Sequence, residues 1–219
     1  MKIISFGDIH EDTSNFIKIK FVLETADLIL VSGDLTNCHG KVEAKNVLDT
    51  IRKHNKNMLV QYGNMDKSEV DEYLTSEGIN LHGNGYLFGD VGIFGCGGSS
   101  PTPFNTPSEI SETDIKKYLT HGYSKVRDAK WKIMVCHTPP KDTVIDAVRS
   151  SMHVGSSVVR DFIVQYKPDV CISGHIHESR GREMLGNTII LNAGMFRDGW
   201  YIEVTIDKKG VSAMLKSIA

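Results

Sequence analysis

Side chains that can bind metal ions follow five short apolar runs of this 219-residue chain. Each of these Asp, Asn or His residues lies just past the point where a run ends. The seven residues are Asp8, His10, Asp34, Asn64, His137, His175 and His177. A single Asp at such a place is often only a helix cap, and a lone His is often only a loop residue. Seven of them after five runs favour one shared site, and the sharpest local pattern is Gly174-His175-Ile176-His177.

The ligand types in this set indicate metal-assisted hydrolysis. Mixed oxygen and nitrogen ligands suit borderline divalent metals such as Mn²⁺, Fe²⁺ and Zn²⁺, and the chain has no Cys-x-x-Cys pair that would predict a structural zinc site. Seven ligands are too many for one ion that keeps a position open, but they suit two ions that share a carboxylate. Two ions about 3.5–4 Å apart bind a phosphoryl oxygen and generate hydroxide near neutral pH.

The five apolar runs are predicted to be buried strands. They cover residues 3–6, 28–31, 58–60, 133–136 and 170–172. Helical patterns over 14–24 and 42–54 separate the first three runs, so the chain opens in β-α-β-α-β alternation. Open α/β sheets bind ligands beyond the carboxyl ends of their strands. We therefore expect the five strand ends to converge on one site.

The middle of the chain, from residue 79, predicts the start of a second, partly antiparallel sheet, and the remaining residues predict further strands and helices. Strand signals lie at 79–81, 86–88, 91–94, 188–191, 200–206 and 211–215. Gly89-Asp90 predicts a hairpin turn, and the Gly-, Ser- and Pro-rich residues 97–107 predict a long surface loop that could border a substrate pocket. A capping box at Ser111 and Asp114 predicts a helix that runs toward Ala129, and 155–166 predicts another.

Composition limits the class of protein. The length fits one domain over residues 1–219. Lys and Arg total 25 against 27 Asp and Glu, which gives a formal net charge of −2 without a basic block and argues against binding to a nucleic-acid duplex. No signal-peptide core and no apolar run of about 18 residues occur, so we expect a cytoplasmic protein without membrane binding. The four cysteines are widely spaced and are expected to be free thiols.

The ordered motifs resemble those of the calcineurin-like metallophosphoesterase superfamily. They are Asp8-x-His10, Gly33-Asp34-Leu35-Thr36-Asn37, Gly63-Asn64-Met65-Asp66, the lone His137 and Gly174-His175-x-His177. The small size and the Gly-His-Ile-His-Glu ending are most similar to the Icc-related predicted phosphoesterases. The resemblance implies an α/β fold in which two mixed β-sheets pack face to face and are flanked by helices, a four-layer sandwich.

The same resemblance implies a site with two divalent ions. One ion would take Asp8, His10 and His177, the other would take Asn64, His137 and His175, and Asp34 would bridge them. Mn²⁺ is the favoured metal, with Fe²⁺, Zn²⁺, Co²⁺ or Ni²⁺ as alternatives. Asn64 and His10 are also the expected catalytic residues. The implied activity is hydrolysis of a small phosphate ester by a metal-bridging hydroxide.

Two positions depart from the family pattern. Many members have a histidine directly after the motif asparagine, where it helps to hold the phosphate and can protonate the leaving alkoxide, but this chain has Met65. A thioether cannot donate a proton, so a phosphodiester or nucleotide-type substrate fits better than an alkyl monoester. Asn37 stands where the family often has Asp.

Other functions remain open at this stage. The first alternative is a non-catalytic metal-binding scaffold or interaction module of the same fold, and the second is a metallohydrolase for carboxylate esters or amides. The sequence leaves the oligomeric state open. His153 is a candidate to approach the site from a loop, whereas the other four histidines outside the motifs are expected to be solvated surface residues. They are His39, His54, His82 and His121.

Overall fold

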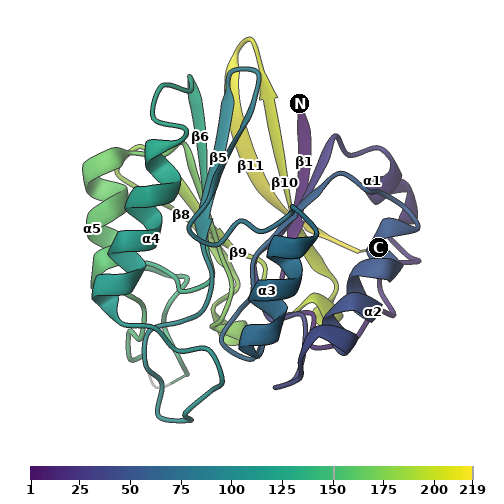
Figure 1. Ribbon diagram of the computed structural model, residues 1–219. Helices are drawn as coiled ribbons and strands as arrows, with labels where there is room; N and C mark the ends of the chain where they lie inside the picture. The colour runs from purple at the N-terminus through teal and green to yellow at the C-terminus, as the bar shows by residue number, and fades with distance from the viewer. Residues whose placement is uncertain (150, 219) are drawn as a thin grey trace.

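Two mixed β-sheets form the centre of the computed structural model, which describes residues 1–149 and 151–218 (Figure 1). The first sheet has the order β11-β10-β1-β2-β3 and the second has the order β4-β5-β6-β7-β9-β8. The strands of the first sheet are β1 (Lys2–Phe6), β2 (Leu28–Val31), β3 (Met58–Val60), β10 (Trp200–Asp207) and β11 (Gly210–Ser217). Those of the second are β4 (Gly85–Phe88), β5 (Val91–Cys96), β6 (Trp131–Cys136), β7 (Val170–Ser173), β8 (Gly181–Leu185) and β9 (Thr188–Asn192).

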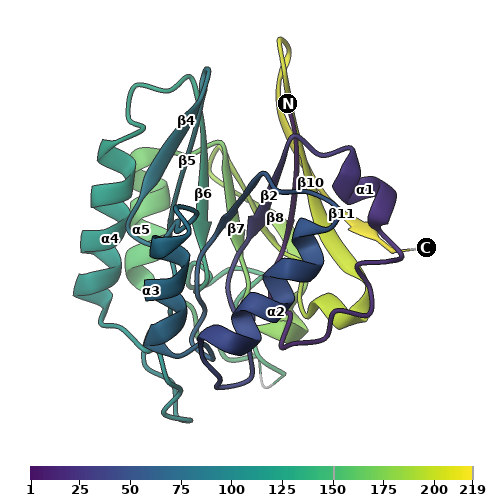
Figure 2. The same cartoon turned by 45° about the vertical axis from the view of Figure 1, so that its right-hand side comes forward.

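Each sheet combines a parallel centre with antiparallel edges. In the first sheet β1, β2 and β3 are parallel, and β10 pairs antiparallel with β1 and β11. In the second sheet β5, β6, β7 and β9 are parallel, while β4 and β8 pair antiparallel at the two edges. The carboxyl ends of the parallel strands therefore point to one side of the molecule, the lower side in Figures 1 and 2.

Helices cover the outer faces of both sheets (Figure 2). They are α1 (Lys20–Glu24), α2 (Lys41–Arg52), α3 (Ser68–Ser76), α4 (Glu112–Ser124) and α5 (Ser157–Tyr166), with 3₁₀ turns η1 (His177–Ser179) and η2 (Phe196–Asp198). Three apolar layers result: α1, α2 and α3 on the first sheet, the two sheets on each other, and α4 with α5 on the second sheet. Successive side chains of a strand point to opposite faces of the sheet, so each sheet contributes to two apolar layers. In β1, Ile3 faces the other sheet whereas Ile4 faces the helices. The predicted four-layer α/β sandwich is confirmed.

Several predicted elements have different bounds in the structure. The helix expected over 14–24 is only α1, because side chains in the preceding turns bond to the backbone instead: Asp12 accepts from the Ser14 N–H, and Asn15 donates to the Phe196 carbonyl. Residues 79–81 make an isolated bridge rather than a strand. Helix α4 begins at the predicted cap, where Ser111 accepts from the Asp114 N–H, but it ends at Ser124.

The four histidines that were expected at the surface divide into two groups. His39 and His121 are exposed, as predicted. For His54 and His82 the prediction of a solvated surface residue is wrong, because both are partly buried. The ring of His82 packs between Tyr62 and Tyr118, with centroids 4.8 and 4.1 Å away, and its Nδ1 accepts from the Gly97 N–H at 3.0 Å.

The four cysteines are free, with Cys38 exposed and the other three buried in or beside strands. Among the described residues, no helix combines the length and apolar character that a membrane span requires.

Candidate metal centre

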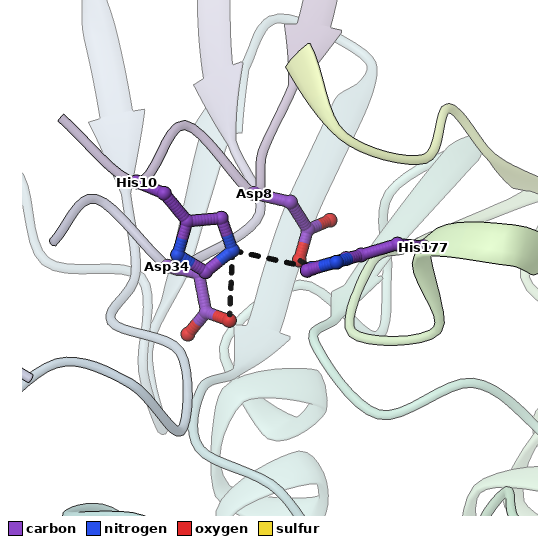
Figure 3. Close-up of side chains that lie close together, drawn as sticks. All are labelled: Asp8, His10, Asp34 and His177. Carbon is purple, nitrogen blue, oxygen red and sulfur yellow. Dashed lines mark hydrogen bonds and ion pairs between the residues drawn. The ribbon is translucent and has the colours of Figure 1, made fainter. Parts of the chain in front are cut away.

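Four of the predicted ligands form one cluster beyond the carboxyl ends of β1, β2 and β7 (Figure 3). They are Asp8, His10, Asp34 and His177, and one ligand atom from each lies within 4.8 Å of the others. His10 Nε2 is 3.7 Å from Asp34 Oδ2 and 3.2 Å from His177 Nε2, and His177 Nε2 is 3.2 Å from Asp8 Oδ1. We call Asp8, His10 and His177 the first ligand group, and Asp34 lies beside it.

The other three predicted ligands lie on the opposite side of Asp34. Asn64 Oδ1 is 3.0 Å from His137 Nε2 and 2.7 Å from His175 Nδ1. His137 Nε2 is 3.4 Å from Asp34 Oδ2, the same oxygen that faces His10. We call Asn64, His137 and His175 the second ligand group. All seven predicted residues are thus brought together, with one oxygen of Asp34 between the two groups.

Backbone carbonyls orient two of the imidazoles. His10 Nδ1 lies 3.3 Å from the Thr36 carbonyl, and His137 Nδ1 lies 2.9 Å from the Ser32 carbonyl. Because a carbonyl only accepts, each Nδ1 must carry a proton, and Nε2 is the ring nitrogen that faces the ligand groups and would bind a metal ion. Asn37 also supports this region, since its amide donates to the His10 carbonyl at 2.9 Å.

The backbone at four of the ligands adopts a left-handed conformation that residues other than glycine seldom take. Asp8, His10, Asp34 and His175 have φ values of 48°, 48°, 51° and 69°. Left-handed residues of this kind cost about 1 kcal/mol each, and Asp and His tolerate the region better than most. Sharp bends directly after the strands turn these side chains into the site, and such strain is concentrated at functional sites in proteins.

The glycines of the motifs leave room for the ligands. A Cβ on Gly174 would lie 2.5 Å from Asp8 Oδ2, and one on Gly33 would lie 2.6 Å from His137 Nδ1. A Cβ on Gly63 would overlap with Asp34 Oδ1 and with the Asp34 backbone nitrogen. In the Gly-Asp, Gly-Asn and Gly-His pairs of the motifs, the first residue is therefore glycine because any side chain there would overlap with a ligand residue.

Gly63→Ala should lower metal affinity by about 10–100-fold, because the added methyl displaces Asp34. Gly181→Ala is the matched control, since its Cβ would meet Val144 at an ordinary 3.4 Å. Titration of the metal-stripped proteins with Mn²⁺, followed by calorimetry, measures the difference. Equal affinities in the two variants would contradict the steric role of Gly63.

The electrostatics of the centre favour cations. Burial by itself would raise the pKa of Asp34 and lower that of His137, but their mutual attraction outweighs burial: the pKa of Asp34 falls well below its usual range and that of His137 rises to about 9. Burial, together with the charge of His137, lowers the pKa of His175 to about 4. Asp8 and Asp34 are 1% and 2% exposed, so the site holds two buried carboxylates that need positive charge nearby.

The donor set fits divalent metal ions. Nitrogen and oxygen atoms that face one another at 2.7–3.7 Å, with Nε2 of His10 only 3.2 Å from Nε2 of His177, are arranged to share a cation. His177 is the exception in exposure, because 34% of its side chain is accessible against 8% or less for His10, His137, Asp8 and Asp34. The centre therefore opens to solvent beside His177.

Asp66 supports the centre, a role that the sequence analysis missed. Its carboxylate is fully buried and accepts from the N–H groups of Leu35, Thr36 and Gly63 at 3.1, 2.8 and 2.8 Å, and from the Thr36 hydroxyl at 2.8 Å. It thus ties the loop after Asp34 to the loop that carries Asn64. The signal in the sequence was the second acidic residue of Gly63-Asn64-Met65-Asp66.

Comparison with known proteins agrees with this geometry. The sequence profile of the calcineurin-like phosphoesterase family matches residues 1–179. The chain belongs to this family. The chain is 33% identical to an uncharacterized protein of Methanocaldococcus jannaschii over 196 residues, which cover 88% of this chain and 87% of that protein. The resemblance drawn from the motifs is confirmed.

Solved structures share the fold of this calcineurin-like phosphoesterase. The protein TT1561 of Thermus thermophilus superposes with a TM-score of 0.75 at 16% identity, over 100% of this chain and 99% of that one. A dimetal phosphatase from Danio rerio superposes with a TM-score of 0.63 at 10% identity, over 100% and 99% of the two chains. The family and the ligand cluster together make this a metal-dependent phosphoesterase.

Proposed function

We propose that this phosphoesterase uses two divalent metal ions and acts on a small phosphodiester or nucleotide-type substrate. The observation that carries the dinuclear proposal is the position of Asp34 Oδ2, which is 3.7 Å from His10 Nε2 in one ligand group and 3.4 Å from His137 Nε2 in the other. A carboxylate oxygen between two sets of ligands is the bridging arrangement of two-metal hydrolases.

The residues would divide between the ions as the two ligand groups do. Asp8, His10 and His177 would hold one ion, Asn64, His137 and His175 would hold the other, and Asp34 would bind both. When bound, the ions neutralise the phosphate and lower the pKa of a water for attack on phosphorus. We favour Mn²⁺, because the mixed nitrogen and oxygen donors suit it, and the same donors also accept Fe²⁺, Zn²⁺, Co²⁺ or Ni²⁺.

His10 and Asn64 have a second role in the proposal. Asn64 Oδ1 faces His137 and His175, so its Nδ2 group is left to donate a hydrogen bond to a phosphate oxygen. His10 is fixed by the Thr36 carbonyl and directs Nε2 at the opening beside His177. Asn64 can therefore hold the phosphate directly, whereas His10 would position it through the ion that its Nε2 binds.

Met65 supports the preference for diesters. Its N–H donates to Asp34 Oδ1 at 2.8 Å, which fixes the residue at the edge of the centre, and its sulfur lies 3.9 Å from Cys38 Sγ. A phosphomonoester has three terminal oxygens on phosphorus, whereas a phosphodiester has two, and a second ester group takes the place of the third. An apolar thioether cannot donate a hydrogen bond to a third oxygen, but it can contact an ester group.

The test combines metal content with turnover. We expect metal-stripped protein resupplied with Mn²⁺ to bind two ions per chain by elemental analysis. It should then hydrolyse aryl phosphodiesters or cyclic nucleotides faster than alkyl phosphomonoesters. Binding of less than one ion per chain under saturating Mn²⁺ would contradict the dinuclear site. Two bound ions without turnover of any phosphate ester would favour the scaffold alternative, and turnover of carboxylate esters instead would favour another metallohydrolase.

A further inference from the structure

A buried carboxylate organises the loop that joins β6 to α5. Asp146 is 0% exposed, although it lies in a loop. Backbone N–H groups of Asp142, Thr143 and Gly155 donate to it at 3.1, 2.8 and 3.0 Å, as does the Thr143 hydroxyl at 3.3 Å. Burial of a carboxylate is costly unless donors surround it, and Asp146 has them. It is therefore a fixed anion beneath the loop surface.

His153 is the fifth partner of this carboxylate. Its Nδ1 lies 2.7 Å from Asp146 Oδ1, while 39% of its side chain is exposed. Because the carboxylate accepts, Nδ1 donates, and Nε2 is left without a hydrogen bond to any described residue. The bond to Asp146 raises the pKa of His153, and the carboxylates of Asp142 and Glu183 act in the same direction.

The loop that carries Asp146 and His153 is attached to the turn that begins at the exposed ligand, His177. Ala147 pairs with His153 across the loop, and the Ala147 carbonyl accepts from the Ser179 hydroxyl. The Arg149 N–H donates to Glu178 at 3.1 Å. Ser179 and Glu178 belong to η1, the turn that begins at His177, the exposed ligand. The imidazole–carboxylate pair is thus connected through two contacts to the turn where the centre opens.

We propose that His153, oriented by Asp146, donates a proton to the leaving oxygen of the substrate. This inference rests on the proposed phosphodiesterase function and supplies the donor that Met65 cannot provide. As the bond from phosphorus to the leaving oxygen breaks, its electron pair stays on that oxygen, which takes the proton from His153 Nε2. The imidazole ends neutral, and the attacking water releases one proton to solvent as its oxygen forms the new bond to phosphorus. Asp146 is a positioning residue.

The dependence of rate on leaving-group pKa tests this assignment. Phosphodiesters with aryl and alkyl leaving groups are compared at saturating Mn²⁺ in wild type, His153→Gln, Asp146→Asn and His39→Gln. A proton donor contributes about 10²–10⁴-fold for poor leaving groups and little for good ones. We expect a shallow dependence in wild type and a steep one in His153→Gln, which should lose at least about 10²-fold on alkyl leaving groups but little on 4-nitrophenyl.

The other two variants separate the donor from general effects. Asp146→Asn keeps the imidazole but weakens its orientation, so its dependence should lie between those of wild type and His153→Gln. His39→Gln is the matched control, because His39 also pairs with a carboxylate, Glu11, at 2.7 Å but from a different loop. It should behave as wild type. Metal content and circular dichroism spectra that match wild type show that the variants are folded.

Clear results would overturn the assignment. An unchanged leaving-group dependence in His153→Gln would do so, and so would a steep dependence in His39→Gln alone. Wild type that already shows the steep dependence would mean that no residue donates the proton. These outcomes differ from failure of the proposed function, in which wild type hydrolyses none of the phosphodiesters at all.

Discussion

Replacing Asp34 with alanine should remove both metal ions and lower phosphodiester hydrolysis by at least about 10³-fold. Its Oδ2 faces His10 at 3.7 Å and His137 at 3.4 Å, so one substitution weakens both ligand groups. Loss of metal charge stabilisation costs several kcal/mol of transition-state energy, and about 4 kcal/mol corresponds to a factor of about 10³. Elemental analysis and turnover of an aryl phosphodiester measure the two effects.

Variants that remove a ligand from only one of the two ligand groups provide the comparison for Asp34→Ala. His177→Ala should reduce binding of one ion and His175→Ala should reduce binding of the other, because these side chains belong to separate ligand groups. Asp34→Ala should therefore lose more metal than either. If Asp34→Ala still binds two ions and keeps wild-type turnover, the carboxylate does not bridge.

Replacing Asp66 with alanine should lower the free energy of unfolding by about 3–5 kcal/mol. Three backbone N–H groups and the Thr36 hydroxyl would lose their acceptor inside the protein. An unsatisfied buried donor costs about 1–3 kcal/mol, and partial relaxation or entry of water offsets some of the total. Urea denaturation in the presence of a chelator isolates this effect from metal binding.

Asp71→Ala is the control for Asp66→Ala. The Asp71 carboxylate accepts from the Asn80 amide at 2.7 Å in a partly buried position, where water can replace it. We expect a loss of about 1 kcal/mol. Asp66→Asn should lie between the two, because its amide keeps one acceptor oxygen. A loss below about 1 kcal/mol in Asp66→Ala would show that water satisfies the four donors.

The parallel strands and their ligands were predictable because their signals are local. Buried parallel strands appear as continuous apolar runs, and a strand ends where a glycine and a polar residue follow. Since parallel strands of one sheet point the same way, the carboxyl ends of β1 and β3 lie together, so Asp8 and Asn64 could be assigned to one site from the sequence. His175 follows β7 of the other sheet, so its place in the same site depended on the family motif.

Elements with weak local signals were missed. Helix α3 has only Val70, Tyr73 and Leu74 as its buried residues, too short a pattern to stand out. Strand β8 lies at a sheet edge with intermediate and exposed residues, so it lacks an apolar run. The helix expected over 14–24 is shortened by side-chain contacts, such as that of Asn15 with the Phe196 carbonyl, 181 residues away.

The sequence by itself determined the parallel strands and the seven side chains that follow them, because apolar runs and residue types are local signals, and its resemblance to a family implied the layered α/β fold. The family motifs also implied how the ligands divide around Asp34. Only the tertiary structure decided which other residues support them. Asp66 and Asp146 are ordinary acidic residues in the sequence, and their roles come from donors that fold around them. The connection of His153 to the turn at His177 likewise depends on contacts between separate loops, which no local pattern encodes.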